Sequence, residues 1–145
     1  MLPADLVELM RSMGVFPAVL GTANKDGEVH MTFITWVYPI SEKVLRFALS
    51  SGSKSAKNLQ ERAAACLMFF SLGKALACYG DVRMVVERIE DIKFPVSVFE
   101  MQINRVEDNL FPGGTVTGTI PFAHTGNLEK MVELDGLVIE AMKGQ

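Results

Sequence analysis

Residues 50–62 read SSGSKSAKNLQER, a run of small residues, hydroxyls and two lysines where a helix is expected to begin. The first turn of a helix usually carries acidic residues, because the aligned peptide dipoles leave partial positive charge there. This chain has Lys54 and Lys57 instead. A bound phosphate would reverse the repulsion between the lysines and the dipole, and backbone N–H groups beside small residues would donate to it. We therefore predict an anion site here; the alternative interpretation is an ordinary solvated loop.

Four serines supply hydroxyl donors for this predicted anion site, namely Ser50, Ser51, Ser53 and Ser55. The run lacks the GxxxxGK[ST] spacing of a phosphate-binding loop, and no GxGxxG motif occurs in the chain. The pattern therefore does not predict a P-loop enzyme or a dinucleotide-binding fold of the usual kind.

The sequence offers few other side chains that could take part in catalysis or bind a metal ion. Cys66 and Cys78 form no CxxC motif and no Cys/His cluster, so we expect buried thiols and no metal site. His30 is expected at the surface, with a ligand groove as the alternative, and His124 is expected to lack a carboxylate partner. Since no Ser/His/Asp set or pair of carboxylates stands out, any catalysis would have to come from a cofactor.

Composition limits the classes of protein to consider. The chain has 145 residues with 49% hydrophobic content, which predicts a single domain over 1–145. Its net charge of −3 argues against a nucleic-acid surface, which would need a basic stripe. No apolar run reaches the roughly 18 residues of a membrane span. The opening MLPADLVELMRSMG has no apolar signal segment, so we predict a cytoplasmic protein without a membrane partner.

Hydrophobic periodicity predicts a mainly β chain with minor helical content. Short helices are expected over 3–13 and 54–62. Strands are expected at 16–23, 28–38, 44–49, 63–71, 77–89 and 96–106, with a short edge strand at 115–120. This order is not the alternation of a parallel sheet, so we predict an antiparallel sheet that curls into a small barrel. Arg46 and Arg83 are expected on exposed faces of that barrel, with a ligand groove as the alternative for each.

The strand predicted over 28–38 has two different faces. Its odd positions, which include Val29, Met31 and Phe33, are apolar enough to form a core. Its even positions, from His30 onward, mix aromatic and polar side chains, which indicates a ligand or a partner subunit.

The segment 124–144 is expected to be helical, because apolar residues recur at helical spacing. Gly136 costs about 1 kcal/mol relative to alanine inside a helix. A helix that ends at Asp135 and is followed by a short strand is therefore the alternative.

Two segments together resemble a known family. FPAVLGTANKDGEVHMTFITWVY at 16–38 and VLRFALSSGSKSAKNLQERAAACLMFF at 44–70 resemble the FMN-binding split-barrel family related to pyridoxamine 5′-phosphate oxidase. The small bacterial FMN-binding proteins are especially similar: they share an opening like MLP, a Thr-Trp pair as in Thr35-Trp36, and a run like that from Lys54 to Asn58. The resemblance covers about residues 1–72.

The resemblance implies a six-stranded antiparallel split β-barrel with short flanking helices, a homodimer, and FMN at the subunit interface. It assigns Ser53, Lys54 and Ser55 to the FMN phosphate. It places Thr35 and Trp36 beside the flavin ring, although strict alternation would put their side chains on opposite faces. Ser50 and Ser51 become secondary phosphate or ribityl contacts, and Asn58 is expected to make a structural hydrogen bond.

One departure from the family limits the implied activity. Pyridoxamine-phosphate oxidases end in an arginine-rich segment that grips substrate phosphate, whereas this sequence ends IEAMKGQ with no arginine after Arg105. We therefore do not expect that reaction. The resemblance implies an FMN-dependent oxidoreductase or an electron carrier, reduced by a nicotinamide nucleotide or a redox protein, and it leaves open whether the protein is an enzyme.

Two alternatives remain at this point. The same groove would take F420 or haem in other relatives of this fold, although F420 would need more cations and haem would need a histidine ligand. A cofactor-free barrel that acts as a binding or sensory module is the other alternative.

Overall fold

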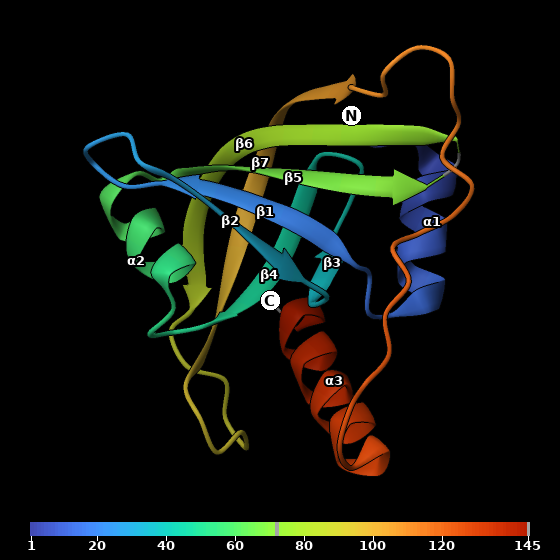
Figure 1. Cartoon of the computed structure of the whole chain (residues 1–145). Coiled ribbons are helices and arrows are strands. Elements are labelled where there is room, and N and C mark those ends of the chain that lie inside the picture. Colours follow the sequence, from blue (N-terminus) through green and yellow to red (C-terminus); the bar gives the residue numbers. More distant parts are fainter. Residues whose placement is uncertain (72, 145) are drawn as a thin grey trace.

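The computed structural model of the chain describes residues 1–71 and 73–144, which form three helices and one curved sheet (Figure 1). The helices are α1 (Ala4–Met13), α2 (Lys54–Glu61) and α3 (Leu128–Lys143). The strands are β1 (Ala18–Ala23), β2 (Val29–Ile34), β3 (Val37–Pro39), β4 (Val44–Ser50), β5 (Ala64–Ser71), β6 (Lys74–Val86) and β7 (Val96–Asp108). All strand pairs are antiparallel, and the order is β2-β1-β5-β6-β7-β4-β3. The predicted mainly β, antiparallel fold is thus confirmed.

The strand predicted over 28–38 is divided at Thr35 and Trp36, so the sheet has seven strands rather than the expected six. The Thr35 carbonyl accepts hydrogen bonds from the N–H of Phe16, at 2.8 Å, and from that of Val37, at 3.1 Å. The second of these bonds closes a tight turn of the γ type. As a result β2 and β3 lie on opposite edges of the sheet, and the turn joins the two edges of a half-barrel.

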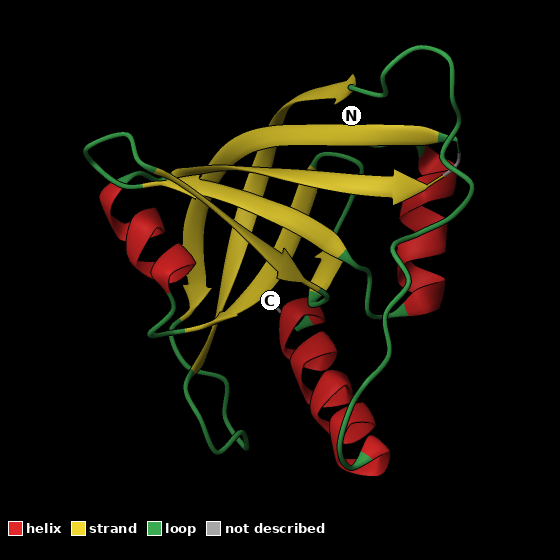
Figure 2. Ribbon diagram, in the orientation of Figure 1, coloured by secondary structure: helices red, strands yellow, loops and turns green. Residues whose placement is uncertain are grey.

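The main hydrophobic core fills the concave side of this half-barrel. Phe47 and Phe99 stack within it with ring centroids 5.7 Å apart. Phe16 and Phe69 lie equally close, at 5.7 Å, in a tilted arrangement. Figure 2 shows the three helices outside the sheet, with α1 and α2 at opposite ends. A second, smaller cluster lies where α3 packs on the strands.

The face of β2 that was expected to enter the core is instead exposed. Val29, Met31 and Phe33 are 75%, 68% and 47% exposed. The register of β2 on β1 explains this outcome, because Thr32 pairs with the fully buried Leu20. Cross-strand partners share one face of a sheet, so the even positions of β2 point inward and the odd positions outward.

The C-terminal part of the chain also differs from the prediction in one respect. Residues 115–120 do not form a strand, whereas α3 continues without interruption through Gly136. Asn127 caps α3 by accepting the N–H of Lys130 at 3.0 Å. Of the two alternatives for 124–144, the single helix is therefore correct. None of the helices in the described residues combines the length and the apolar character that crossing a bilayer demands.

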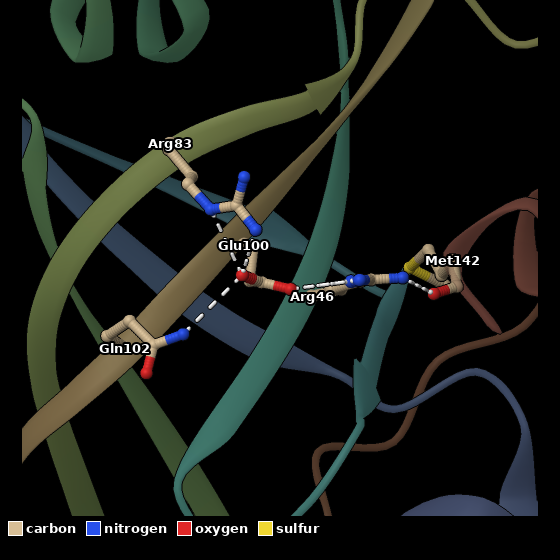
Figure 3. A network of polar contacts seen from close by, with 5 residues as sticks. All are labelled: Arg46, Arg83, Glu100, Gln102 and Met142. Atoms are coloured by element: carbon tan, nitrogen blue, oxygen red, sulfur yellow. Dashed lines mark hydrogen bonds and ion pairs between the residues drawn. The ribbon is translucent and has the colours of Figure 1, made fainter. Parts of the chain in front are cut away.

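Arg46, which was expected on an exposed face, is buried between β4 and α3 (Figure 3). Its guanidinium donates to Glu100 Oε1 and, at 2.8 Å, to the carbonyl of Met142 at the end of α3. Arg83 is exposed, as expected, but it too donates to Glu100. Burial of Arg46 is possible because its charge and its hydrogen-bond donors are matched on both sides.

Candidate functional site

A cavity of about 310 Å³ opens between β2, the Thr35-Trp36 turn, the end of β4 and the start of α2. It is lined by His30, Thr32, Phe33, Ile34, Thr35, Trp36, Ala48, Leu49, Ser50, Ser53 and Ser55. Among the predicted site residues, the lining includes Thr35, Trp36, Ser50, Ser53 and Ser55 but neither Ser51 nor Lys54. The fold therefore brings two segments that are distant in the sequence to one cavity.

The polar end of the cavity is built by the turn from β4 into α2. The N–H of Ser53 donates to the Ser50 carbonyl at 3.0 Å, which closes the turn. Ser53 then caps α2, and its Oγ accepts the N–H of Ala56 at 3.2 Å. The N–H groups of Lys54 and Ser55 lie in the first turn of α2, before the first N–H that bonds to a carbonyl of the same helix, which is that of Lys57. With no acidic residue in its first turn, this helix start is suited to an anion.

The two predicted contacts that do not line the cavity differ in their surroundings. The Ser51 hydroxyl lies 2.7 Å from that of Ser97, which donates to the Glu87 carbonyl at 2.6 Å. Ser51 is therefore engaged with β7 rather than directed at the cavity. Lys54 is exposed at the first position of α2, between the lining residues Ser53 and Ser55.

Asn58 has the structural role expected of it. Its Nδ2 donates to the Thr22 hydroxyl at 3.1 Å, and both side chains are buried. This bond ties α2 to β1 and so holds the helix start in place beside the cavity.

The apolar end of the cavity is connected to α3 through Trp36. The indole Nε1 of Trp36 donates to Oδ1 of Asp135 at 2.8 Å, and Oδ2 of Asp135 lies 2.7 Å from Nε2 of His124. The expectation that His124 has no carboxylate partner is therefore wrong. No local sequence pattern indicates the contact between Trp36 and Asp135, because these residues are separated by 99 positions and meet only in the folded chain.

An aromatic row borders the same end of the cavity. Phe33 lines the cavity and lies 6.1 Å, centroid to centroid, from Phe122 in an edge-to-face arrangement. Phe122 in turn lies 5.6 Å from the ring of His124. His30, which was expected at the surface, is half-buried and lines the cavity as well.

The cavity thus has two chemically different ends. Hydroxyls and a helix start lie at one end, and aromatic and aliphatic side chains lie at the other. This arrangement fits an elongated ligand with an anionic tail and a flat ring system. The described residues include no group of three histidine, cysteine or acidic side chains placed to hold a metal ion.

Comparison with known families gives one match. The family model described as pyridoxamine 5′-phosphate oxidase matches residues 12–116, which include β1 to β7 and α2. No curated protein matches the sequence significantly.

Several solved structures share the fold. An FMN-binding protein of Syntrophomonas wolfei is 18% identical with a TM-score of 0.54, covering 74% of this chain and 88% of its own. A Lactobacillus delbrueckii protein, provisionally described as a pyridoxamine 5′-phosphate oxidase, is 15% identical with a TM-score of 0.61, covering 73% and 93%. HutZ of Vibrio cholerae, described as a heme storage protein, is 12% identical with a TM-score of 0.56, covering 74% and 95%.

An F420 reductase shares the fold as well, at 14% identity and a TM-score of 0.53 over 63% of this chain and 89% of its own. Proteins with this fold are therefore described with FMN, F420 or haem. At these identities the likeness concerns the fold alone.

Proposed function

We propose that this chain, which belongs to the pyridoxamine 5′-phosphate oxidase family, binds FMN in the cavity beside α2 and serves as an oxidoreductase or electron carrier. The observation that carries the proposal is the cavity itself, in which Thr35 and Trp36 meet the serine-rich start of α2. When bound, FMN supplies hydride and electron transfer. The protein supplies binding, orientation and electrostatics.

In this proposal the start of α2 holds the FMN phosphate. The hydroxyls of Ser53 and Ser55 and the N–H groups of the first turn donate to it, and Lys54 adds positive charge from the helix surface. The helix dipole and Lys54 repel each other without a ligand and both attract the phosphate. This is our explanation for a lysine at a position that usually favours an acid.

The ring of FMN would lie at the other end, against Trp36 and the backbone of Thr35. Ile34 and Leu49 are apolar lining residues that would exclude water from one ring face. The edge of the ring that exchanges electrons has to stay accessible to a donor. A reduced nicotinamide nucleotide or a redox protein is the donor class that we propose.

We also propose a homodimer that covers the outer face of β2. The exposed apolar side chains Val29, Met31 and Phe33 lie in a row on that face, which continues onto β1 and β5 in a hollow lined by Val19, Met68 and Phe70. An exposed apolar surface of this kind is typical of a protein interface. Since Phe33 also lines the cavity, a partner subunit there would lie beside the ligand.

The direct test is to purify the protein without its ligand and titrate it with FMN, following the flavin absorption band and fluorescence. Saturable uptake supports the proposal, and a protein that neither co-purifies with flavin nor takes it up contradicts it. Riboflavin, which lacks the phosphate, is the matched control ligand and should bind more weakly.

Haem is the second candidate, because the half-buried His30 lines the same cavity and would offer a ligand to iron. Parallel titrations with haem and F420 separate these cofactors from FMN by their absorption spectra. No uptake of any of the three would favour a cofactor-free binding module. A cytoplasmic location stays a prediction from the sequence.

A further inference from the structure

Asp135 is a buried carboxylate that joins three separate parts of the molecule. It lies on α3 and is 7% exposed. One oxygen accepts the indole N–H of Trp36 and the other pairs with His124, at 2.8 Å and 2.7 Å. Burying a carboxylate is costly unless it is paired or hydrogen-bonded, and these two contacts compensate for the burial of Asp135.

Trp36 lies at the boundary between the cavity and the second hydrophobic cluster. It lines the cavity and also packs against that cluster, to which α3 contributes Val138 and Met142. Its carbonyl accepts the N–H of Ala48 at 3.1 Å, which fixes the backbone. A fixed backbone alone does not set the two dihedral angles of the side chain, and the hydrogen bond to Asp135 selects one orientation.

His124 extends the same connection to the chain between β7 and α3. Residues 109–127 have no helix or strand, and the Asn109 N–H donates to the Ala75 carbonyl at the start of the segment, at 2.8 Å. The contact of Phe122 with Phe33 and that of His124 with Asp135 provide two further attachments next to the cavity.

We propose that Asp135 is a positioning residue of the cavity: it fixes the indole of Trp36 as a wall for the planar part of the ligand, and it holds His124 on the same side. Asp135 does not line the cavity, so it acts through Trp36. The ligand identity, FMN, rests on the proposed function above, whereas the orientation of Trp36 by Asp135 does not.

The first test compares FMN affinity in variants of the full chain. Asp135→Leu keeps the branch at Cγ and the number of side-chain heavy atoms but removes both acceptors, and we expect it to weaken FMN binding about tenfold. Asp135→Asn retains an oxygen for the indole N–H and an amide for His124, so it should stay within about threefold of the unchanged protein. Glu133→Gln is the control: it also removes one negative charge from α3, but at an exposed position, and it should not change the affinity for FMN.

A double-mutant cycle separates positioning from general stability. In a Trp36→Phe background no indole N–H remains, so Asp135→Leu should weaken FMN by less than about threefold further. Equal losses in both backgrounds would mean that Asp135 acts through the stability of α3 rather than through Trp36, and this would overturn the proposal.

The last test needs no FMN, so it separates failure of this proposal from failure of the proposed function. Trp36 is the single tryptophan of the chain, so fluorescence and the indole N–H signal in NMR report on it alone. We expect that signal to exchange slowly with D₂O in the unsubstituted protein and in Asp135→Asn. Asp135→Leu should speed the exchange and shift the emission to the red. Fast exchange in the unsubstituted protein would overturn the proposal even if Asp135→Leu failed to fold.

Discussion

Arg46 and Glu100 are direct register partners on β4 and β7, and their side chains form a buried ion pair with Arg46 Nη2 2.9 Å from Glu100 Oε1 (Figure 3). The other carboxylate oxygen accepts from Arg83 at 2.8 Å. The remaining guanidinium nitrogen of Arg46, Nη1, donates to the Met142 carbonyl at the end of α3. This pair therefore links the sheet to the helix that carries Asp135.

Glu100→Gln is expected to destabilise the fold, because it leaves the charge of Arg46 buried without its counter-charge. We expect the free energy of unfolding to fall by about 3 kcal/mol, measured by urea denaturation. Glu133→Gln on the exposed side of α3 is the matched control and should change it by less than about 0.5 kcal/mol. Equal effects of the two substitutions would contradict a special role for the pair.

The same ion pair predicts how stability depends on acid. Burial alone would raise the pKa of Glu100, but the hydrogen bonds and charges of Arg46 and Arg83 outweigh it and lower that pKa below the ordinary 4.5. The unfolded chain therefore takes up this proton at a higher pH than the native protein. The stabilisation is complete above pH 4.5 and is lost as the pH falls through the lowered native pKa. Denaturation between neutral and acid pH should show a steeper loss for the unsubstituted protein than for Glu100→Gln; identical slopes would refute this.

The two cysteines are expected to differ in reactivity. Cys78 is fully buried, and burial is the largest cause that raises the pKa of its thiol to about 12. Cys66 is only half-buried and lines the apolar hollow on the outer face of the sheet. Iodoacetamide should therefore modify Cys66 first in the folded protein, as intact-mass measurements would report, and both thiols after denaturation. Equal rates in the folded state would contradict the burial of Cys78.

The rate at Cys66 also tests the proposed dimer. If a second copy covers the outer face of β2, β1 and β5, alkylation of Cys66 should slow as the protein concentration rises. Met31→Lys, which puts a charge on that face, should restore fast labelling and yield a monomer in size-exclusion chromatography. If the alkylation rate of Cys66 did not depend on the protein concentration and the unsubstituted protein eluted as a monomer, the proposed dimer through this face would be wrong.

Gly80 is expected to tolerate no side chain. It lies at a bulge in the pairing of β6 with β7, and a Cβ there would overlap the Gln102 carbonyl and approach Met101 Cγ to 2.7 Å. Gly80→Ala should lower the free energy of unfolding by about 2–3 kcal/mol, because backbone atoms must move. Gly118→Ala, where a Cβ meets nothing within 4 Å, is the control for thermal denaturation. If Gly80→Ala and Gly118→Ala both changed the free energy of unfolding only slightly, the claim that the bulge leaves no room for a Cβ at Gly80 would be wrong.

The local features of the fold could be predicted from the sequence. Strand alternation, the turn that ends β4 and the Ser53 cap depend on neighbouring residues, so their signals lie within a few positions of one another. The division of β2 from β3 could not be predicted in this way. Residues typical of strands continue through Thr35 and Trp36 without a glycine or proline to mark a turn, and only the pairing of each half with a different sheet edge breaks the strand.

The polar partners that connect α3 to the sheet could not be predicted either. Arg46 and Met142 stand 96 positions apart, and Trp36 and Asp135 stand 99 apart. A charged residue in a predicted strand is usually exposed. The prediction for Arg46 followed this general preference and was therefore wrong. Such partners become visible only when the sheet order and the position of α3 are known.

The anion site at the start of α2 predicts separate effects of two adjacent residues. Lys54 is exposed and contributes charge without packing, so Lys54→Ala should weaken FMN about tenfold. The thermal stability of the ligand-free protein should not fall, and removal of the repulsion between Lys54 and the helix dipole should raise it slightly. Ser53 also caps the helix, so Ser53→Ala should weaken FMN and in addition lower the free energy of unfolding by about 1 kcal/mol. The Lys54 effect should shrink for riboflavin and at high salt, because it depends on the phosphate charge. Lys57→Ala, one turn further along the same exposed surface, is the charge-matched control. If it weakened FMN binding as much as Lys54→Ala, the two lysines would act only through a general attraction between the positive charge of α2 and FMN. The assignment of Lys54 to the phosphate would then be wrong.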